Sequence, residues 1–242
     1  MKRRNLILAT AGSVGLWVPR LALAATPCPP PQVSVGGSSA NTSCGTSTPG
    51  YTTNFLTDEN PFSEGGNFTS TDDDLTRVRS SGGKCFGVTD YMRNYEDAYA
   101  LKTGSWSANQ EGEAVIHRAS GYNPNANHEV EILLRGTESG SSRSWYETLW
   151  NKDGDFAIVY LNGEAGDWTD LSAPFTQTVP KNGDVFRVNV IGNTITGYVN
   201  DVKKVQVSDS RLTSGRPGFG FFYRAGATNS GYGYSRYTCR SL

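Results

Sequence analysis

The stretch HEVEILLRG, residues 128 to 136, places a histidine, two glutamates and an arginine in a segment that alternates like a β-strand. Glu129 and Glu131 are two residues apart, so on a strand they point to the same side, with about 6 to 7 Å between their backbone positions. Glycoside hydrolysis uses two carboxyl groups about 5 to 9.5 Å apart, depending on its stereochemistry. Acid–base chemistry on a sugar is one interpretation of this strand, and the solvated side of a sheet is the other.

The elements that must position these groups are strands. Beyond Tyr51 the chain consists of short apolar alternations separated by turns at intervals of about 8 to 12 residues, which is typical of antiparallel sheets. Turn pairs such as Gly192-Asn193 and Asn200-Asp201 support hairpins. The alternating runs cover residues 75–80, 112–118, 128–135, 144–150, 156–162, 184–192, 193–201 and 217–224. We predict an all-β antiparallel β-sandwich, a jelly roll, of about a dozen strands.

Parity within the strands predicts which side chains face the core, because successive side chains of a strand point to opposite sides. The side chains expected in the core are Ala114, Ile116, Val130, Ile132, Leu134, Phe186, Val188 and Val190. Those expected on the other side are Glu113, His117, Glu129, Glu131, Arg135, Arg187 and Asn189. This second set is planar and rich in hydrogen-bonding groups, and Trp145, Tyr146, Trp150, Tyr160, Trp168 and Tyr198 lie close to it in sequence. Such a lining suits a saccharide, whose hydroxyls need donors and acceptors and whose C–H faces stack on rings.

The N-terminus has the form of an export signal. Residues 1–25 combine a basic start, an apolar middle and an A-x-A-like end near Ala24 or Ala25. Arg3-Arg4 resembles a twin-arginine signal, although a merely basic start would look similar. Residues 26–51 are rich in Pro, Gly, Ser and Thr and are interpreted as a linker or arm, leaving one domain at 52–242. A secreted or periplasmic protein without a membrane anchor is expected.

Composition excludes some partners. The chain has 242 residues, and its 22 basic and 23 acidic residues give a net charge of −1 without blocks of like charge, so nucleic acid is not expected as a partner. The positions of the four cysteines along the chain suggest that Cys28 pairs with Cys44 and Cys85 with Cys239, which is one of three possible pairings. No cofactor is required for sugar chemistry, but the acidic run STDDDLT (70–76), with Glu64 nearby, could hold a structural calcium.

Four segments together resemble a known superfamily. NPFSEGGNF (60–68), HEVEILLR leading into WYETLW, DVFRVNVIGNTITGYVND and GRPGFGFFYR look like parts of the jelly-roll domains of the concanavalin A-like lectin/glucanase superfamily. Residues 192–222 are also similar to the hairpin and closing strand of laminin-G-like domains. The resemblance covers about residues 54 to 239 and rests on structural motifs, so it implies a fold more than an activity. Family-16-type glucanases of this superfamily carry E-x-D-x-x-E on one strand, and here Leu133 and Leu134 follow Glu131 where the second catalytic Glu is expected.

The jelly-roll polysaccharide lyases of the superfamily imply another site. In these, Arg and Asn or Gln neutralise a uronate carboxylate, His or Tyr removes the C5 proton and Tyr protonates the leaving oxygen. The chain offers Arg135 or Arg187 with Asn189, His117 or His128, and Tyr146 or Tyr198, although the alginate-lyase motifs themselves are absent. The predicted catalytic set is His117, Tyr146, Arg135 and Asn189, and the predicted substrate-binding set is Glu113, Glu131, Arg187, Tyr198 and Trp145.

These observations predict a polysaccharide or glycan as the partner. The leading hypothesis is a polysaccharide lyase that acts by β-elimination on one sheet face. A non-catalytic, lectin-like binding domain and a glycoside hydrolase are the alternatives. The sequence does not define the sugar, the linkage or the oligomeric state.

Overall fold

The computed structural model describes residues 49–70, 76–89, 95–123, 127–139, 142–163, 167–176, 178–224 and 229–242. The predicted export signal, the predicted arm up to residue 48, Cys28, Cys44 and the acidic residues Asp72 to Asp74 lie outside these ranges. The first strand begins at Gly50, two residues before the predicted start of the domain. Within the described ranges, no helix has the length and apolar character needed to cross a membrane.

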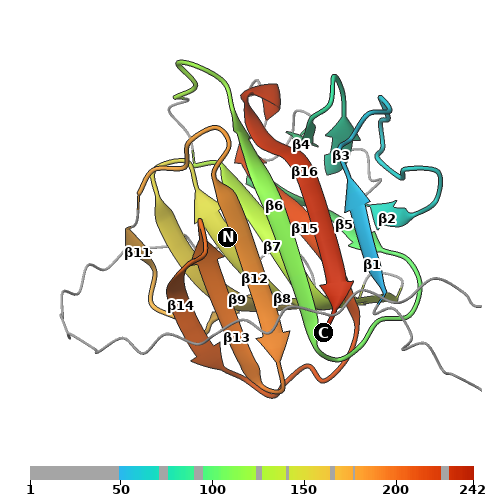
Figure 1. Ribbon diagram of the computed structural model, residues 1–242, viewed down its shortest axis with the longest axis vertical. Coiled ribbons are helices and arrows are strands. Elements are labelled where there is room, and N and C mark those ends of the chain that lie inside the picture. The colour runs from blue at the N-terminus through green and yellow to red at the C-terminus, as the bar shows by residue number, and fades with distance from the viewer. Residues whose placement is uncertain are drawn as a thin grey trace, which may run out of the picture. The chain divides into compact units, whose positions relative to one another are not determined.

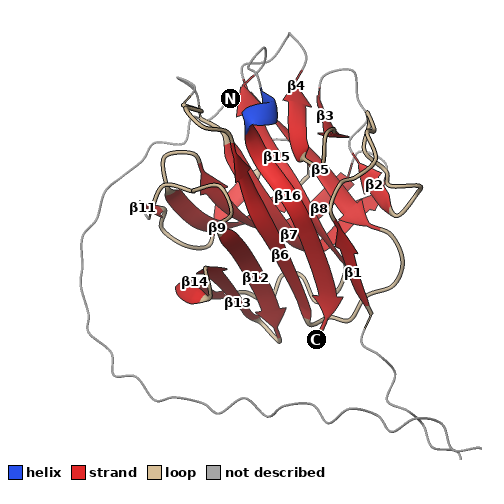
Figure 2. Ribbon diagram, turned by 45° about the horizontal axis from the view of Figure 1, so that its top comes forward, coloured by secondary structure: helices blue, strands red, loops and turns tan. Residues whose placement is uncertain are grey.

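The described residues form two antiparallel sheets of eight strands each, packed face to face, which confirms the predicted all-β sandwich (Figures 1 and 2). Sheet A has the strand order β14-β13-β12-β6-β16-β4-β3, with β1 on β16. Its strands are β1 (Gly50–Thr53), β3 (Thr76–Ser80), β4 (Cys85–Thr89), β6 (Gln110–Arg118), β12 (Val185–Ile191), β13 (Thr194–Val199), β14 (Val202–Ser208) and β16 (Tyr232–Ser241).

Sheet B has the order β10-β9-β8-β7-β15-β5-β2, with β11 on β9. Its strands are β2 (Phe68–Ser70), β5 (Tyr95–Lys102), β7 (Glu129–Ser139), β8 (Ser142–Asn151), β9 (Asp155–Asn162), β10 (Trp168–Asp170), β11 (Phe175–Thr176) and β15 (Arg216–Arg224). A short 3₁₀ turn, η1 (Asn229–Gly231), precedes β16. The strands beyond the predicted dozen are short ones such as β10 and β11, whose two or three residues are too few to show an alternation.

The core between the sheets contains all of the side chains that parity placed there. Val130, Ile132 and Leu134 of β7 face Phe186, Val188 and Val190 of β12 across one apolar cluster. Aromatic rings fill one end of this cluster around Phe219, which contacts the rings of Phe55, Phe62, Phe68, Phe221, Tyr234 and Tyr237. Burial of this apolar area is the main favourable contribution to folding.

Buried tyrosines of β16 tie the two sheets together. Their hydroxyl groups donate hydrogen bonds to backbone carbonyls of sheet B: Tyr232 to Trp150 at 2.9 Å, Tyr234 to Glu131 at 2.9 Å and Tyr237 to Gly218 at 3.0 Å. Each of these bonds gives a buried hydroxyl group its hydrogen-bond partner and fixes the position of the opposite sheet. The second of these bonds holds the part of β7 that carries the charged residues.

The predicted Cys85–Cys239 disulfide is wrong, because both residues are free buried thiols. Cys85 of β4 lies beside Tyr234 of β16, whereas Cys239 is five positions further along that strand and pairs with Gly112. This separation is about 13 Å or more along the strand, and a disulfide needs Cα atoms within about 7 Å. Burial raises the pKa of Cys85 well above its usual value and that of Cys239 to about 12.

Alkaline pH is expected to unfold this protein through its buried tyrosines and thiols. Burial is the first cause that raises the pKa of Tyr51, Tyr99 and Tyr146 to about 12 and that of Tyr234 well above its usual value. In the unfolded chain a thiol has a pKa of about 8.5 and a tyrosine one of about 10. The unfolded chain therefore loses these protons first, so the stability is full below about pH 8.5, declines above it and declines more steeply from about pH 10 to 12.

Urea unfolding at a series of pH values from neutral to alkaline measures this decline. Tyr234→Phe removes one of the titrating groups, so its free energy of unfolding should fall less steeply above about pH 10 than that of the unchanged protein. A free energy of unfolding that stays constant up to about pH 11 would contradict the assignment of these buried groups.

Candidate functional site

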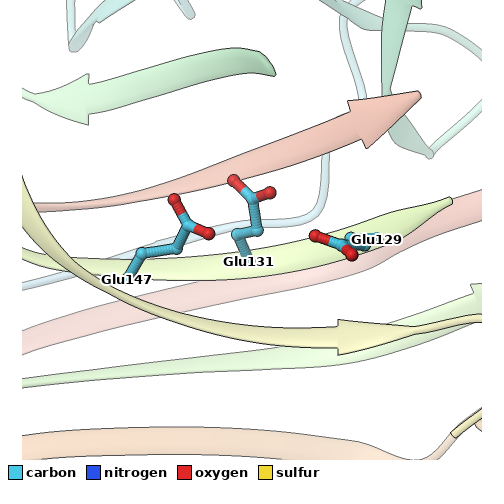
Figure 3. A group of neighbouring side chains, drawn as sticks. All are labelled: Glu129, Glu131 and Glu147. Carbon is cyan, nitrogen blue, oxygen red and sulfur yellow. The ribbon is translucent and has the colours of Figure 1, made fainter. Parts of the chain in front are cut away.

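Three glutamates meet on the outer face of sheet B, the face turned away from the core. Glu129 and Glu131 lie on β7 and Glu147 lies on the adjacent strand β8. One carboxylate oxygen from each lies within 4.8 Å of the others, and all three side chains are buried. Figure 3 shows the carboxyl groups of Glu131 and Glu147 pointing to the same side, with Glu129 further along β7. We call Glu129, Glu131 and Glu147 the three-glutamate cluster.

The pairing of β7 with β8 brings Glu147 to this place. Glu147 lies directly opposite Leu133, so it shares the face of Glu131, two residues earlier on β7. This register depends on a bulge between Leu134 and Thr137. Near the turn, Thr137 pairs with Ser144 and Glu138 with Arg143. If this register continued without the bulge, Glu147 would lie opposite Leu134, whose side chain is in the core.

Arg135 maintains the bulge. Its backbone has a φ of 53°, in the left-handed region that a non-glycine residue rarely adopts. Its guanidinium donates hydrogen bonds to three carbonyl oxygens: Ala108 at 2.8 Å, Leu212 at 2.6 Å and Gly192 at 2.6 Å. Its backbone N–H donates to Gln110 Oε1 at 3.0 Å. These bonds hold the strained residue in place.

Apolar side chains surround the cluster, so sheet B is apolar on both faces. Two buried groups share the outer face: Tyr99, Leu101, Leu133, Trp145 and Leu161 form one, and Leu149, Ala157 and Val159 form the other, with Trp168 packed against it. The expectation of one dry and one polar face describes this sheet incompletely. The glutamates thus lie in a largely apolar setting, where polar interactions are stronger than in water.

Neighbouring groups position two of the three carboxylates. Trp145 donates its indole N–H to Glu147 Oε2 at 3.3 Å. Gly220 lies opposite Glu131 on β15, and a Cβ at that position would come within 2.4 Å of Glu131 Oε2, so the glycine leaves room for the carboxylate where it lies. The backbone of Glu131 is held by Tyr234 from the other sheet.

Arg135 and Tyr146, predicted as catalytic, are both buried and both contact the loop at Leu212. The Tyr146 hydroxyl donates to Asp209 Oδ1 at 2.8 Å and accepts from the Leu212 N–H at 2.8 Å. Burial, followed by the interaction with Asp209, raises the pKa of Tyr146 to about 12, although the bond from Leu212 opposes this. Arg135 therefore does not share the face of Glu131, contrary to parity, because the bulge turns its side chain toward the loop at Leu212.

His117 and Asn189, the other two predicted catalytic residues, lie on the outer face of sheet A. Asn189 is paired with Glu111 on β6, and His117 is six residues further along the same strand, which is about 20 Å away. Burial lowers the pKa of His117, and nearby Lys84 lowers it further. The structure does not bring the four residues of the predicted β-elimination site together on one face.

The predicted substrate-binding residues divide between the sheets. Glu131 and Trp145 belong to the three-glutamate cluster and its surroundings. The other three, Glu113, Arg187 and Tyr198, lie on the outer face of sheet A. There Arg187 pairs with Glu111 and Asp201, both at 3.1 Å, its guanidinium lies 4.0 Å from the Tyr198 ring centroid, and Glu113 faces Arg236 at 3.5 Å. Burial opposes the charge of Arg187, but Glu111 and Asp201 outweigh it and raise its pKa.

Sequence reasoning missed the role of Glu147. Alternation along the strand places Glu147 on the same side as Trp145 and Leu149. Because both sides of this strand carry large apolar groups, the sequence does not show which side faces the core. The hairpin 129–151 signals that the two strands pair, but an unbroken register would have placed Glu147 on the core side. Only the bulge assigns it to the glutamates of β7.

The cluster is suited to two kinds of chemistry. Three carboxylates at this spacing match the oxygen ligands that Ca²⁺ or Mg²⁺ prefers. Two carboxyl groups about 5 to 5.5 Å apart also form the acid and nucleophile of retaining glycosidases. The acidic run predicted to hold calcium lies outside the described residues apart from its ends, and Glu64, named with it, accepts hydrogen bonds from Tyr51 and Thr53.

Comparisons with known proteins identify the fold. No protein-family model and no curated protein sequence matches the chain. Among solved structures, the κ-carrageenase from Pseudoalteromonas carrageenovora in complex with an oligotetrasaccharide of κ-carrageenan has a TM-score of 0.51 and 11% identity, covering 84% of this chain and 99% of that one. The carbohydrate-binding module CBM66 from Bacillus subtilis has a TM-score of 0.50 and 12% identity, covering 72% and 92%. The chain has the concanavalin A-like lectin/glucanase β-sandwich fold, as its sequence resemblance implied.

Replacing Arg135 is expected to destabilise the protein strongly. Arg135→Lys leaves one amine for three buried carbonyl oxygens, and each unsatisfied buried group costs about 1 to 3 kcal/mol. We expect the free energy of unfolding in urea to fall by about 3 kcal/mol. Arg211→Lys, at a side chain that is 45% exposed, is the matched control and should change it by less than about 0.5 kcal/mol. Equal losses in the two variants would show that the carbonyl contacts of Arg135 do not stabilise the bulge.

Proposed function

We propose that this protein is an exported glycoside hydrolase whose catalytic carboxyl groups are Glu131 and Glu147. The observation that carries the proposal is the convergence of the three-glutamate cluster on one sheet of a concanavalin A-like sandwich, beside the indole of Trp145. In the glucanase pattern E-x-D-x-x-E the second glutamate follows the first by five residues, and counted from Glu129 that position is Leu134, whose side chain is in the core. Glu147, directly opposite Leu133, provides the carboxyl group from the neighbouring strand.

The spacing supports a retaining mechanism. The nearest carboxylate oxygens lie within 4.8 Å, which is closer to the roughly 5 to 5.5 Å of retaining enzymes than to the 6.5 to 9.5 Å of inverting ones. Glu147 attacks the anomeric carbon, and Glu131 gives its proton to the glycosidic oxygen as the leaving sugar departs. Glu131 then takes a proton from water, whose oxygen displaces Glu147 from the anomeric carbon and restores both groups.

The surroundings support this assignment of roles. The hydrogen bond from Trp145 stabilises negative charge on the Glu147 carboxylate, as a nucleophile requires. Tyr234 holds the backbone of Glu131, and Gly220 leaves space for its carboxyl group, which favours the defined orientation that proton transfer needs. Glu129 completes the cluster and is assigned a supporting role.

Two fold neighbours provide context for the substrate class. One is a κ-carrageenase with a bound oligosaccharide, and the other is a carbohydrate-binding module. Tyr99, Trp145 and Trp168 on the outer face of sheet B are aromatic side chains of the kind that stack on sugar rings. β-Elimination, the leading hypothesis from the sequence, needs His117, Tyr146, Arg135 and Asn189 around one sugar, and these residues lie on separate faces. Because one of the two fold neighbours is a binding module, a non-catalytic lectin-like role is the second candidate.

A hydrolysis assay with matched variants tests the proposal. The protein is incubated with neutral, sulfated and uronate polysaccharides, and new reducing ends are measured. On the polysaccharide that is cleaved, Glu131→Gln and Glu147→Gln should each lower kcat by about 10²- to 10⁴-fold, the usual contribution of an acid–base group. Glu113→Gln makes the same change on the opposite sheet and should leave kcat unaltered. Sodium azide should restore turnover to Glu147→Ala and yield a glycosyl azide, because azide can replace a missing nucleophile.

Other outcomes would overturn the hydrolase assignment. An unsaturated sugar product that absorbs in the near-ultraviolet would indicate elimination, and retention on a glycan without new reducing ends would indicate a binding domain. Loss of activity in EDTA that Ca²⁺ restores would make the three-glutamate cluster a cation site. Full activity of Glu147→Gln would exclude this residue as the nucleophile.

A further inference from the structure

A pocket lies on sheet A, away from the three-glutamate cluster. It has a volume of about 510 Å³ and is formed by the β3–β4 hairpin and the η1 turn. Pockets for small molecules are typically about 300 to 1,000 Å³. The lining residues are Arg79, Ser81, Gly82, Lys84, Phe86, Val88, Asn229 and Ser230. We call this the hairpin pocket.

The hairpin gives the pocket a positive charge. Arg79 and Lys84 are the charged residues of the lining, and neither makes an ion pair within the described part of the chain. Asp58 lies next to the turn, where its two carboxylate oxygens accept hydrogen bonds from the Ser81 hydroxyl at 3.1 Å and the Gly82 N–H at 2.8 Å. The two cations and the Ser230 hydroxyl therefore remain along the wall as donors for an anionic group.

The opposite wall presents an acceptor that has no donor. Asn229 is 6% exposed, and its buried Oδ1 atom has no hydrogen-bond partner among the described residues. A buried oxygen without a donor is unfavourable, and a ligand hydroxyl would satisfy it. Phe86, buried on β4, adds an apolar surface between the two walls.

We propose that the hairpin pocket binds an anionic sugar, such as a hexuronate. The carboxylate contacts Arg79 and Lys84, a sugar hydroxyl donates to Asn229 Oδ1, and the C–H face of the ring rests against Phe86. A simple anion would leave Asn229 Oδ1 unsatisfied, and a neutral sugar would leave the two cations without a partner. This site is independent of the proposed hydrolysis on sheet B, so failure of one does not affect the other.

Calorimetric titration of the full-length protein with sodium glucuronate tests the site. Glucose and sodium sulfate are titrated separately at the same ionic strength. Glucuronate should bind with a saturable isotherm, and both comparison compounds should bind at least about tenfold more weakly, since each lacks one charge-assisted or hydroxyl contact. Arg79→Gln and Lys84→Gln should each weaken glucuronate binding about tenfold. Lys203→Gln, an exposed lysine of β14 outside the pocket lining, is the matched control and should leave binding unchanged.

Three results would overturn the proposal. These are the absence of saturable glucuronate binding, equal binding of glucose or sulfate, and equal weakening by Lys203→Gln. Because Arg79 is exposed and Lys84 is only partly buried, both variants are expected to fold, and unfolding in urea checks that they do. Activity of the Arg79→Gln and Lys84→Gln variants on a short neutral oligosaccharide should remain that of the unchanged protein, which separates this site from the three-glutamate cluster.

Discussion

The guanidinium group of Arg135 is the contact on which the rest of this structure depends. By donating to the carbonyl oxygens of Ala108, Gly192 and Leu212, it joins β7 to three loops and holds a residue with positive φ in the middle of a strand. The resulting bulge shifts the pairing of β7 and β8 by one residue. Because side chains alternate along a strand, a shift of one residue exchanges the two faces. Glu147 therefore lies beside Glu131 and not in the core.

The packing of the sandwich completes the positioning of the glutamates. Tyr234 reaches from sheet A to the backbone of Glu131, and Gly220 leaves space for its carboxyl group. The apolar side chains that share the outer face of sheet B place the glutamates in surroundings where hydrogen bonds and charges interact strongly. Sheet A differs, since its outer face carries ion pairs such as Arg187–Glu111 and the hairpin pocket. The two faces thus offer different chemistry to a ligand.

Much of the fold was predictable from local pattern. The alternation in residues 128–135 and 184–192 identified both strands and their core side chains, because a half-buried strand must bury every second residue. The candidate site was predictable only in part: Glu131 and Trp145 were identified, whereas Glu147 was not. Arg135 and Tyr146 were assigned to a sugar-binding face, but both contact the loop at Leu212. The local signal of a bulge is Gly136, since a glycine inside a strand pattern often marks one, but it does not show that the Arg135 side chain leaves the face of Glu131.

The sequence by itself determined the class of fold, the strands and their core side, because these follow from the period of apolar residues and from turn chemistry. The tertiary structure decided which polar residues meet. Cys85 and Cys239 lie on neighbouring strands but at different positions along them, so the register of these strands excludes the disulfide predicted from the sequence. Likewise, His117 and Asn189 share a face but lie far apart along it. Register and bulges depend on contacts between distant segments, such as those of Arg135 with three loops, and the pattern within a single strand does not contain them.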